Sequence, residues 1–274
     1  MTSSADPRSI VITGASSGIG AALARAYAAP GRVLGLTGRD AARLADTVAA
    51  ARAAGAEVVE GLFDVRETAA LTAWLQAFDE AHPVDLLVSN AGVVTGLQAG
   101  RSAEVTESAF RLVDVNLKGA IATVSALVER MRARRRGHIV LVSSLAGLYA
   151  HPDLPSYSAS KAAVRFYGDA LRQWLKGSVE VTVVCPGFVT SPMSSRHIGP
   201  KPFEISADKA AGLIRRGIAR RKALIAFPWP LVLPIWFANL VPARVADFFM
   251  GGFAAEIEPD AETARERAGG TGAP

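Results

Sequence analysis

The sequence has very little cysteine. Cys185 is the one thiol among 274 residues, so no internal disulfide can form, which is consistent with a reducing, cytoplasmic setting. This cysteine lies in an apolar run just before Pro186, a position that favours a buried structural thiol over a nucleophile. The four histidines are equally sparse, and no histidine and cysteine stand at metal-ligand spacing. The sequence therefore predicts no metal site.

A signal peptide and a nucleic-acid-binding motif are also missing. The first residues, Thr2 to Asp6, are polar, so we expect no secretory signal. The net charge of +5 permits an anionic ligand, yet no DNA- or RNA-binding motif accompanies it. Five arginines between positions 130 and 136 are interpreted as the solvated end of a helix, where cations suit the helix dipole. We therefore expect no nucleic-acid partner.

What the sequence does have is a regular alternation of short apolar runs with helical patterns. Strands are expected at 9–13, 32–37, 57–64, 84–89, 138–143, 179–185 and 223–227, and the longest helical pattern covers 106–136. This order predicts the α/β class: a Rossmann-type doubly wound parallel sheet of about seven strands with helices on both faces. One domain is expected over residues 1–258, with an apolar helical extension at 228–258 and a disordered tail at 259–274.

Tyr157 and Lys161 lie four residues apart in a helical pattern, so their side chains share one face of the helix. A phenol has a free pKa of about 10, but a cation one turn away favours the phenolate. Ser144 stands at the carboxyl end of an expected strand, where its hydroxyl can hold a carbonyl oxygen. Alone, the Tyr–Lys pair would be an ordinary helix-surface pair; with Ser144 it suits proton transfer to a carbonyl or alcohol oxygen.

A glycine-rich turn joins the first expected strand to the first expected helix. Its glycines follow the spacing G-x3-G-x-G, and they let the backbone approach a pyrophosphate at the helix N-terminus. Parallel strands end at one edge of a sheet, where ligands bind. The residues expected to converge at that edge, because each follows or closes a strand, are Gly14, Asp64, Asn90, Ser144 and Pro186.

In their order and spacing, the motifs of this chain resemble those of the short-chain dehydrogenase/reductase family over about residues 10–227. The matching motifs are Thr13-Gly14-x3-Gly18-Ile19-Gly20, Asp64-Val65, Asn90-Ala91-Gly92, Val115-Asn116-Leu117-Lys118-Gly119, Ser144 with Gly147, Tyr157-x3-Lys161, and Pro186-Gly187 with Thr190. The chain departs from many relatives at Ser89, where they carry a second asparagine. The resemblance implies an NAD(P)-dependent oxidoreductase of the carbonyl reductase or alcohol dehydrogenase type.

The resemblance also implies a role for each matching residue. Tyr157 is the expected general acid–base residue, Lys161 lowers its pKa, and Ser144 holds the substrate oxygen. Asn116 supports a proton relay through Lys161, although an ordinary helix-surface amide is the alternative interpretation. The expected cofactor-binding residues are Gly14, Ser16, Ser17, Gly18, Ile19, Gly20, Arg39, Asp64, Val65, Asn90, Ala91, Gly92, Tyr157, Lys161, Pro186, Gly187, Val189 and Thr190.

The choice between NAD(H) and NADP(H) depends on the end of the second expected strand. An acidic residue there would bind the adenosine ribose and repel a 2′-phosphate, but this chain has Gly38. Arg39 follows and can meet a phosphate, whereas Asp40 is expected in the first turn of the next helix. Ser17 lacks the basic side chain of some NADP-preferring relatives. We therefore predict NADP(H), with NAD(H) as the alternative.

Two later stretches bear on substrate and partners. Residues 188–205 are irregular and contain three prolines, and the part from 190 to 205 is expected to cover the site. Met193, Ile198 and Phe203 in it indicate an apolar substrate. The 19 residues 223–241 carry no charge, but their prolines break helical hydrogen bonding and 223–227 belongs to the last expected strand, so no membrane span is predicted.

The apolar stretch 229–241 has two possible partners. Either it covers the cleft or a subunit interface of the protein itself, or it makes peripheral contact with a membrane surface, helped by the basic residues between 215 and 222. The resemblance implies at least a homodimer, or a homotetramer, built on the helices at 106–136 and around Tyr157. We therefore expect a cytoplasmic location, with membrane-surface association as the alternative.

A function of another class remains to be weighed: a catalytically idle dinucleotide-binding sensor or partner protein. The set Asn116, Ser144, Tyr157 and Lys161 is complete in this chain. A protein that only binds a dinucleotide has no chemical need for that set, so the enzyme is the favoured interpretation.

Overall fold

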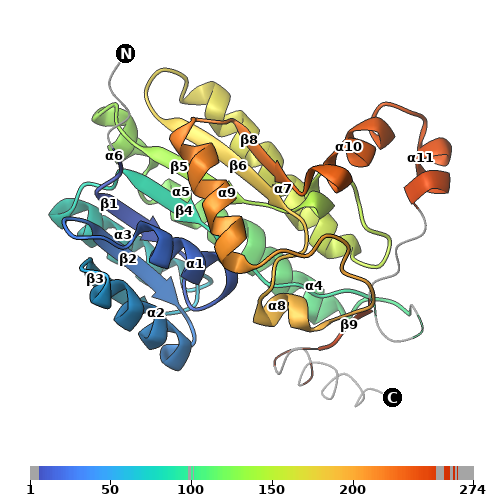
Figure 1. Ribbon diagram of the computed structural model, residues 1–274, viewed down its shortest axis with the longest axis horizontal. Coiled ribbons are helices and arrows are strands. Elements are labelled where there is room, and N and C mark those ends of the chain that lie inside the picture. Colours follow the sequence, from blue (N-terminus) through green and yellow to red (C-terminus); the bar gives the residue numbers. More distant parts are fainter. Residues whose placement is uncertain are drawn as a thin grey trace.

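The structure is a computed structural model that describes residues 6–97, 100, 102–250, 256–259, 262 and 264 (Figure 1). Seven parallel strands form one sheet in the order β3-β2-β1-β4-β5-β6-β8. The strands are β1 Ser9–Ile12, β2 Val33–Gly38, β3 Glu57–Leu62, β4 Leu86–Ser89, β5 His138–Val142, β6 Glu180–Pro186 and β8 Leu224–Phe227. A doubly wound α/β sheet was the predicted class, and the structure confirms it.

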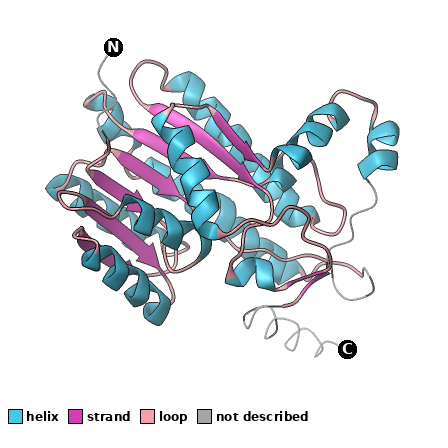
Figure 2. Cartoon of the chain, in the orientation of Figure 1, coloured by secondary structure: helices cyan, strands magenta, loops and turns pink. Residues whose placement is uncertain are grey.

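Helices cover both faces of the sheet (Figure 2). Helices α1 (Gly18–Tyr27), α2 (Ala41–Ala53) and α9 (Ala207–Ala219) pack on one face. On the other face lie α3 (Thr68–Ala81), α4 (Thr106–Val113), α5 (Gly119–Ser125), α6 (Val128–Ala133) and α7 (Pro155–Trp174). A parallel sheet buried in this way requires strands that are apolar on both sides, which explains the continuous apolar runs.

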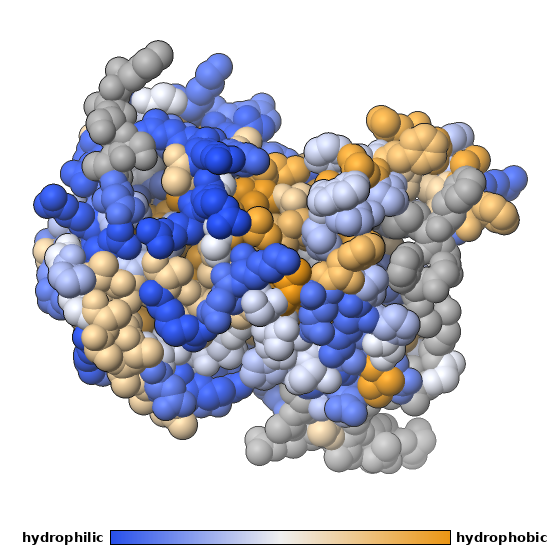
Figure 3. All heavy atoms as spheres, viewed as in Figure 1, coloured by the Kyte–Doolittle hydropathy of each residue, from blue (hydrophilic) through white to orange (hydrophobic). Residues whose placement is uncertain are grey.

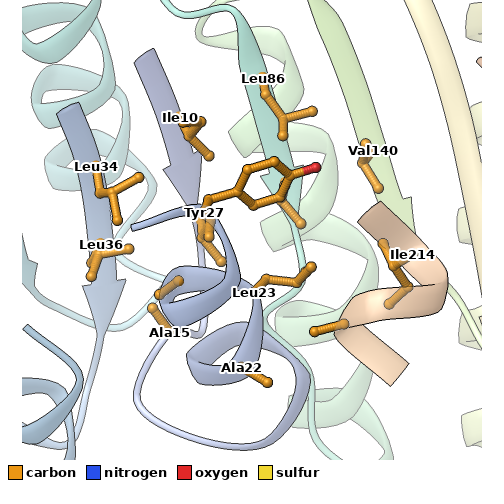
Figure 4. Packing of buried hydrophobic residues seen from close by; sticks show 14 of the residues in the cluster. Ile10, Ala15, Ala22, Leu23, Tyr27, Leu34, Leu36, Leu86, Val140 and Ile214 are labelled. Carbon is orange, nitrogen blue, oxygen red and sulfur yellow. The ribbon is translucent and has the colours of Figure 1, made fainter. Parts of the chain in front are cut away.

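The two cores are separated by the alternation of side chains along each strand. Ile10 and Ile12 of β1 point to the α1 side, whereas Val11 belongs to the core on the other face. Tyr27, at the end of α1, is 2% exposed and fills the first core together with residues of β1, β2, β4, β5 and α9 (Figure 4). Burial on both faces is what holds every strand end in register with its neighbours.

Close packing of α7 against the sheet fixes the distance between the first turns of this helix and the strands. A Cβ atom added at Gly168 would lie 2.4 Å from a side-chain carbon of Val183 on β6, so a larger residue would push the helix outward. Two turns nearer the start of α7, the Ser143 hydroxyl donates a 2.7 Å hydrogen bond to the Lys161 carbonyl. These two contacts fix Tyr157 and Lys161 beside the carboxyl end of β5.

Two predicted segments differ from the structure. The single helix expected at 106–136 is divided by the π-helix η2 (Asp114–Lys118) and by a break before Val128. The irregular stretch 188–205 contains the short helix α8 (Pro192–Ser195) and the strand β7 (His197–Ile198). The predicted ends of the strands differ from the observed ends by one or two residues, which is the usual disagreement between criteria for where a strand or helix ends.

The C-terminal part begins with α10 (Trp229–Ala238) and α11 (Ala243–Met250), which project beside the sheet in Figure 1. Strand β9 (Glu256–Ile257) then pairs antiparallel with β7. Among the described helices, none has both the length and the apolar character that crossing a membrane requires. Of the predicted tail 259–274, the described residues are Pro259, Glu262 and Ala264; the rest, like Thr2 to Ala5 of the predicted polar N-terminus, lie outside the described residues.

Candidate active site

The residues predicted from sequence gather at the carboxyl edge of the sheet, around the ends of the paired strands β1 and β4. The strand order reverses there, because β2 and β3 continue the sheet on one side of β1 and β4, β5 and β6 on the other. Such a switch point leaves a crevice above the strand ends. Gly14 follows β1, Asn90 follows β4, Ser144 follows β5 and Pro186 closes β6.

The glycine-rich turn has the backbone that a phosphate group needs. Gly14 and Gly18 have φ angles of +66° and +52°, in the left-handed region that favours glycine. A Cβ atom at Gly20 would lie 2.2 Å from the Gly14 carbonyl oxygen, so no other residue fits. Ser17 holds the N-cap position of α1 without a side-chain capping bond, which leaves the first N–H groups of the helix available to an anion.

Asn90 fastens this turn to β4. Its amide nitrogen donates to the carbonyl oxygens of Thr13 and Gly14 at 3.0 and 3.1 Å. Its own backbone N–H donates to the Thr13 hydroxyl at 3.1 Å, and that of Ala91 does the same at 3.2 Å. Ala91 and Gly92 therefore leave the strand in a fixed direction, and a Cβ atom at Gly92 would lie 3.2 Å from both Asn116 Oδ1 and Lys161 Nζ.

Ser144 and Tyr157 meet above the end of β5. Ser144 begins the short 3-10 helix η3 (Leu145–Gly147), and its hydroxyl accepts a hydrogen bond from Ala146 N at 3.1 Å. Burial raises the pKa of Tyr157, while a hydrogen bond with Ser144 works in the opposite direction. The sequence predicts that Lys161 lowers this pKa; in the structure burial outweighs any such effect, and the phenol stays protonated at neutral pH.

Lys161 is 5% exposed and lies under the ring of Tyr157, with Nζ 5.8 Å from the ring centroid. Its ammonium donates a 3.1 Å hydrogen bond to the Val142 carbonyl at the end of β5. Burial lowers the pKa of Lys161 to about 8. A protein keeps a cation in so unfavourable a place at a cost in stability, and perturbed groups of this kind cluster at functional sites.

Asn116 is 1% exposed, so the alternative of a helix-surface amide is wrong. Its Oδ1 accepts from Val93 N at 2.8 Å, and its Nδ2 donates to Val93 O at 3.0 Å and to the Ser160 hydroxyl at 3.1 Å. The π-helical turn η2 carries this residue, and such single turns often mark functional sites. Asn116 thus joins the strand-end loop after β4 to the helix of Tyr157 and Lys161.

The last four predicted cofactor-binding residues, Pro186, Gly187, Val189 and Thr190, form one wall at the end of β6 and just after it. Gly187 N donates to the Phe227 carbonyl at 2.7 Å, and a Cβ atom there would lie 2.9 Å from Pro228. Val189 is buried and forms a parallel bridge with Ile205, while Thr190 N donates to the Ile205 carbonyl at 3.0 Å. Pro186 itself is the last residue of the strand. These contacts hold the wall on the β8 side of the crevice.

The adenosine end of the predicted site lies at the ends of β2 and β3. Gly38 closes β2, and a Cβ atom there would lie 3.2 Å from the Ser16 hydroxyl, so the space between these residues is tight. Asp40 caps α2 by accepting from Arg43 N at 3.0 Å, as the sequence predicts. Val65 is buried against Gly119, and Ile19 packs on the α1 core.

Asp64 is surrounded by arginines. Arg66 Nη2 lies 3.0 Å and Arg39 Nη1 lies 3.6 Å from its carboxylate. Partial burial alone would raise the pKa of Asp64, but the hydrogen bonds and charge of Arg66, with Arg39 adding to them, hold it below its usual value. Arg66 was not predicted from the sequence, because an arginine after a strand carries no motif of its own.

An apolar cluster beside Tyr157 is assembled from distant parts of the chain. Val94, Leu154 and Ile257 form a small cluster against which Tyr157 and Met193 pack. Of the three residues in 188–205 predicted to indicate an apolar substrate, Met193 lies here, whereas Ile198 and Phe203 are 47% and 56% exposed. Ile257 was not predicted; β9 pairs with β7 through a contact that no local pattern reveals.

Cys185 and the arginines of 130–136 behave as the sequence predicts. The thiol is buried, and burial raises its pKa to about 11, which is far from that of a nucleophile. Arg130 and Arg134 pair with acidic side chains of α3, and Arg136 pairs with Asp85. The arginine-rich segment is therefore a helix end tied to its neighbours.

Comparison with known proteins agrees with this geometry. A family model described as short chain dehydrogenase matches residues 8–199. An uncharacterised oxidoreductase of Myxococcus xanthus is 38% identical over 242 residues, which cover 88% of this chain and 95% of the relative. The ketoacyl reductase HetN of Nostoc is 37% identical over 209 residues, covering 74% of this chain and 72% of the relative.

A solved structure shows the same fold. The crystal structure of a short chain dehydrogenase/reductase of Burkholderia phymatum in complex with NAD superposes with a TM-score of 0.77. It is 27% identical, and the match covers 92% of this chain and 98% of the other.

The buried ammonium of Lys161 predicts a site that destabilises its own fold at neutral pH. Burial lowers the pKa of Lys161 in the folded protein from the ordinary 10.5 to about 8. Above pH 10.5 the amine is neutral in both the folded and the unfolded state and costs no stability. As the pH falls from 10.5 through 8, the folded protein loses stability, because the unfolded chain binds the proton more readily. Lys161→Met should therefore raise the free energy of unfolding by about 1–3 kcal/mol at pH 7. The gain should shrink at pH 10, as measured by urea unfolding at both values.

The matched control is Lys118→Met, which removes an exposed ammonium that pairs with Asp114 on the same helical turn. This change should leave stability nearly the same at both pH values, because exposed pairs contribute little. A Lys161→Met protein that is less stable at pH 7, with a deficit that does not vary with pH, would show that packing rather than charge governs this position.

Proposed function

This chain belongs to the short-chain dehydrogenase/reductase family, and on that premise we propose that it moves hydride between a nicotinamide dinucleotide and the carbon of a carbonyl or alcohol. The observation that carries the proposal is the meeting of Ser144, Tyr157 and Lys161 at one strand edge, with Asn116 joining that edge to their helix. A bound nicotinamide would supply or accept the hydride. The protein's own residues have to orient the oxygen and move the proton.

In the direction of reduction, the Tyr157 hydroxyl donates its proton to the carbonyl oxygen as the carbon receives hydride, which gives the alcohol. Burial raises the pKa of Tyr157 and so favours the protonated phenol that this step requires. Ser144 lies within hydrogen-bonding reach of Tyr157, so one oxygen atom can be held by both hydroxyls. The Lys161 ammonium stabilises the phenolate that forms, and Asn116 holds its helix in place.

The crevice fits a dinucleotide on the contacts of its own residues. Gly14, Gly18 and Gly20 leave no side chain between the end of β1 and α1, and the α1 N-terminus is open to a pyrophosphate. We propose NADP(H) as the preferred form, because Arg39 and Arg66 stand where a phosphate beside the adenosine ribose would lie. The Burkholderia relative binds NAD, and NAD(H) remains the alternative.

The substrate is proposed to be an apolar carbonyl or alcohol of small-molecule size. Val94, Leu154, Met193 and Ile257 pack around Tyr157 without a charged side chain among them. One relative is named as a ketoacyl reductase, whose substrate carries a ketone on an acyl chain. Reduction of a panel of ketones, followed by the loss of nicotinamide absorbance, tests the proposal.

The rival function, a catalytically idle sensor or partner protein, predicts the same dinucleotide binding without turnover. The buried Lys161 argues against it, because a binding protein gains nothing from the cost of desolvating an ammonium. A protein that binds the dinucleotide but reduces no ketone and oxidises no alcohol in a broad panel would favour the rival.

The structure also changes the hypothesis for residues 229–241. The inward side of α10 covers the sheet, with Val232 and Ile235 packed on Leu145, Leu148 and Val183. Trp236 and Phe237 on the outward side of α10, and Leu240 just after the helix, are exposed. The projecting end of the molecule, where Figure 1 shows α10 and α11, is largely hydrophobic in Figure 3. The basic residues at 220–222 precede β8, whereas α10 follows it, and Arg221 pairs with Glu180. This separation supports a subunit contact over a membrane surface as the partner of α10.

A second exposed apolar area lies on the helices predicted to form a dimer. Phe110 on α4, Ile121 on α5, and Phe166 and Trp174 on α7 are all exposed. We propose that these helices pair with their copies and that the outward side of α10 makes a further subunit contact. Peripheral membrane contact through α10 is the alternative for that side.

Tyr157→Phe should lower turnover by roughly 10²- to 10⁴-fold with little change in dinucleotide affinity, because the transferable proton is lost and the ring remains. Turnover with the best ketone and the dissociation constant by fluorescence titration measure the two effects. Tyr167→Phe, which removes a hydroxyl ten residues further along α7, is the matched control and should keep its turnover. A Tyr157→Phe enzyme with most of its activity would show that this hydroxyl is not the proton donor.

Arg39→Ala should weaken NADPH binding by about tenfold and leave NADH binding nearly unchanged, because a guanidinium contributes a charge-assisted hydrogen bond to phosphate. We expect only about a tenfold loss of NADPH affinity, because the Arg39 side chain is 45% exposed and solvent weakens its contact with a phosphate. Isothermal titration of both dinucleotides measures it, with Arg43→Ala as the control arginine that pairs with Asp40 on the neighbouring helix. Equal affinities of the wild type for the two dinucleotides would contradict the proposed preference.

Light scattering should give a mass of at least twice the 28.6 kDa of the chain. Replacing Trp236, Phe237 and Leu240 by serine should lower a tetramer to a dimer and leave the fold intact, because these side chains are exposed. An unchanged mass, together with sedimentation of the wild type but not the variant on anionic vesicles, would assign this side of α10 to a membrane surface instead. Deleting α10 is unsuitable, since it uncovers Leu145 and Leu148.

A further inference from the structure

Three arginines from separate elements meet one carboxylate beside the adenosine end of the crevice. Arg39 Nη1 lies 3.0 Å from Glu262 Oε2, Arg66 Nη1 lies 3.0 Å from Oε1, and Arg111 Nη1 lies 3.5 Å from Oε2. We call Arg39, Arg66 and Arg111 the arginine site. They come from the end of β2, the turn after β3 and helix α4, so the fold assembles a cation cluster that no sequence motif contains.

The arginine site suits a group with several anionic oxygens. Glu262 bridges the three guanidinium groups with two oxygens, and Asp64 pairs with Arg39 and Arg66 beside it. A phosphate monoester carries about −1.5 to −2 at neutral pH and offers three acceptor oxygens, so in place of Glu262 it could meet the same guanidinium groups with more charge and one more acceptor. Arg111 is 4% exposed, which makes an anion at this place more valuable than one at an open surface.

Glu262 is held near the arginine site by anchored residues just before it. Ile257 is buried in the apolar cluster beside Tyr157, and β9 pairs with β7. Glu258 N donates to the Arg196 carbonyl at 2.8 Å, and Arg196 Nη1 donates to the Glu258 carbonyl at 3.2 Å. Because the anchor lies only four residues away, the carboxylate has a high effective concentration at the arginines.

We propose that Glu262 is an internal competitor for the phosphate that NADP(H) carries on its adenosine ribose, with Arg66 and Arg111 joining Arg39 in the site for that phosphate. The proposal rests on the proposed function. NADPH has to displace the Glu262 carboxylate before its phosphate can bind, whereas NADH brings no group of that charge. The C-terminal carboxylate therefore reduces the discrimination that the three arginines would otherwise give.

The test compares Glu262→Gln with wild type by isothermal titration of NADPH, NADH and adenosine 2′,5′-bisphosphate. Surface ion pairs contribute little individually, so removing the competitor should tighten NADPH and the bisphosphate by roughly two- to tenfold. NADH affinity should stay the same. The gain should shrink at about 1 M salt, where charges are screened within a few ångströms. In the Arg66→Ala background, Glu262→Gln should give a smaller gain, since the two side chains act on each other.

Glu256→Gln is the matched control, because it removes the same charge from the same part of the chain at an exposed position on β9. An equal gain from Glu256→Gln would overturn the proposal in favour of a general charge effect. Unchanged NADPH and bisphosphate affinity in Glu262→Gln would also overturn it. If the wild type binds the two dinucleotides equally and Glu262→Gln then prefers NADPH, the competition is supported and only the wild-type preference is corrected. If neither protein binds any dinucleotide, the proposed function fails, and the competitor fails with it.

Discussion

The whole site depends on the side chain of Asn90, which ties the glycine turn to the neighbouring strand. Its two hydrogen bonds to the carbonyls of Thr13 and Gly14 join the ends of the paired strands β4 and β1, where the strand order reverses. From there a chain of polar contacts continues: Asn116 holds both backbone groups of Val93 and reaches Ser160, whose hydroxyl donates to the Tyr157 carbonyl. Joined through the backbone of Ala91 and Gly92, the two sets of hydrogen bonds fix the place of the glycine-rich turn relative to Tyr157.

This network explains why the protein can retain an unfavourable lysine. Lys161 sits among apolar groups and the Val142 carbonyl, and its pKa shows the cost of desolvation. The helix cannot move to relieve it, since Gly168 packs directly on Val183 and Ser143 holds the Lys161 carbonyl. The fold therefore keeps a poorly solvated charge next to the phenol, where a phenolate formed during turnover would be its natural partner.

The sequence predicts the strand-end residues because their position follows from two local signals. Apolar runs give the strands, and the first polar or glycine residue after each run gives the edge, so Gly14, Asn90 and Ser144 could be placed without coordinates. The arginine site could not, because Arg39, Arg66 and Arg111 are brought together by packing between elements. Helix η2 was missed for a related reason: its register change serves the contacts of buried Asn116, which the apolar periodicity of 106–136 does not record.

Topology separates the basic residues at 220–222 from α10, although the two are close in the sequence. A helix that returns along a parallel sheet runs opposite to the strands, so the last turn of α9 and residues 220–222 lie at the amino edge, away from α10. The residues before β8 and the helix after it are thus separated by the full length of that strand. Two segments that are close in sequence can therefore lie at opposite edges of the sheet when a strand stands between them.

The C-terminal residues meet two separate clusters of the site. Ile257 packs in the apolar cluster beside Tyr157, and Glu262 pairs with Arg39 and Arg66 beyond the ends of β2 and β3. The two residues are five positions apart, so the chain between them spans at most about 18 Å even when fully extended. One short segment, far from both clusters in sequence, thus supplies an apolar side chain to one and a carboxylate to the other. Both contacts depend on the pairing of β9 with β7, which brings this segment to the carboxyl edge of the sheet and which no local pattern in the sequence indicates.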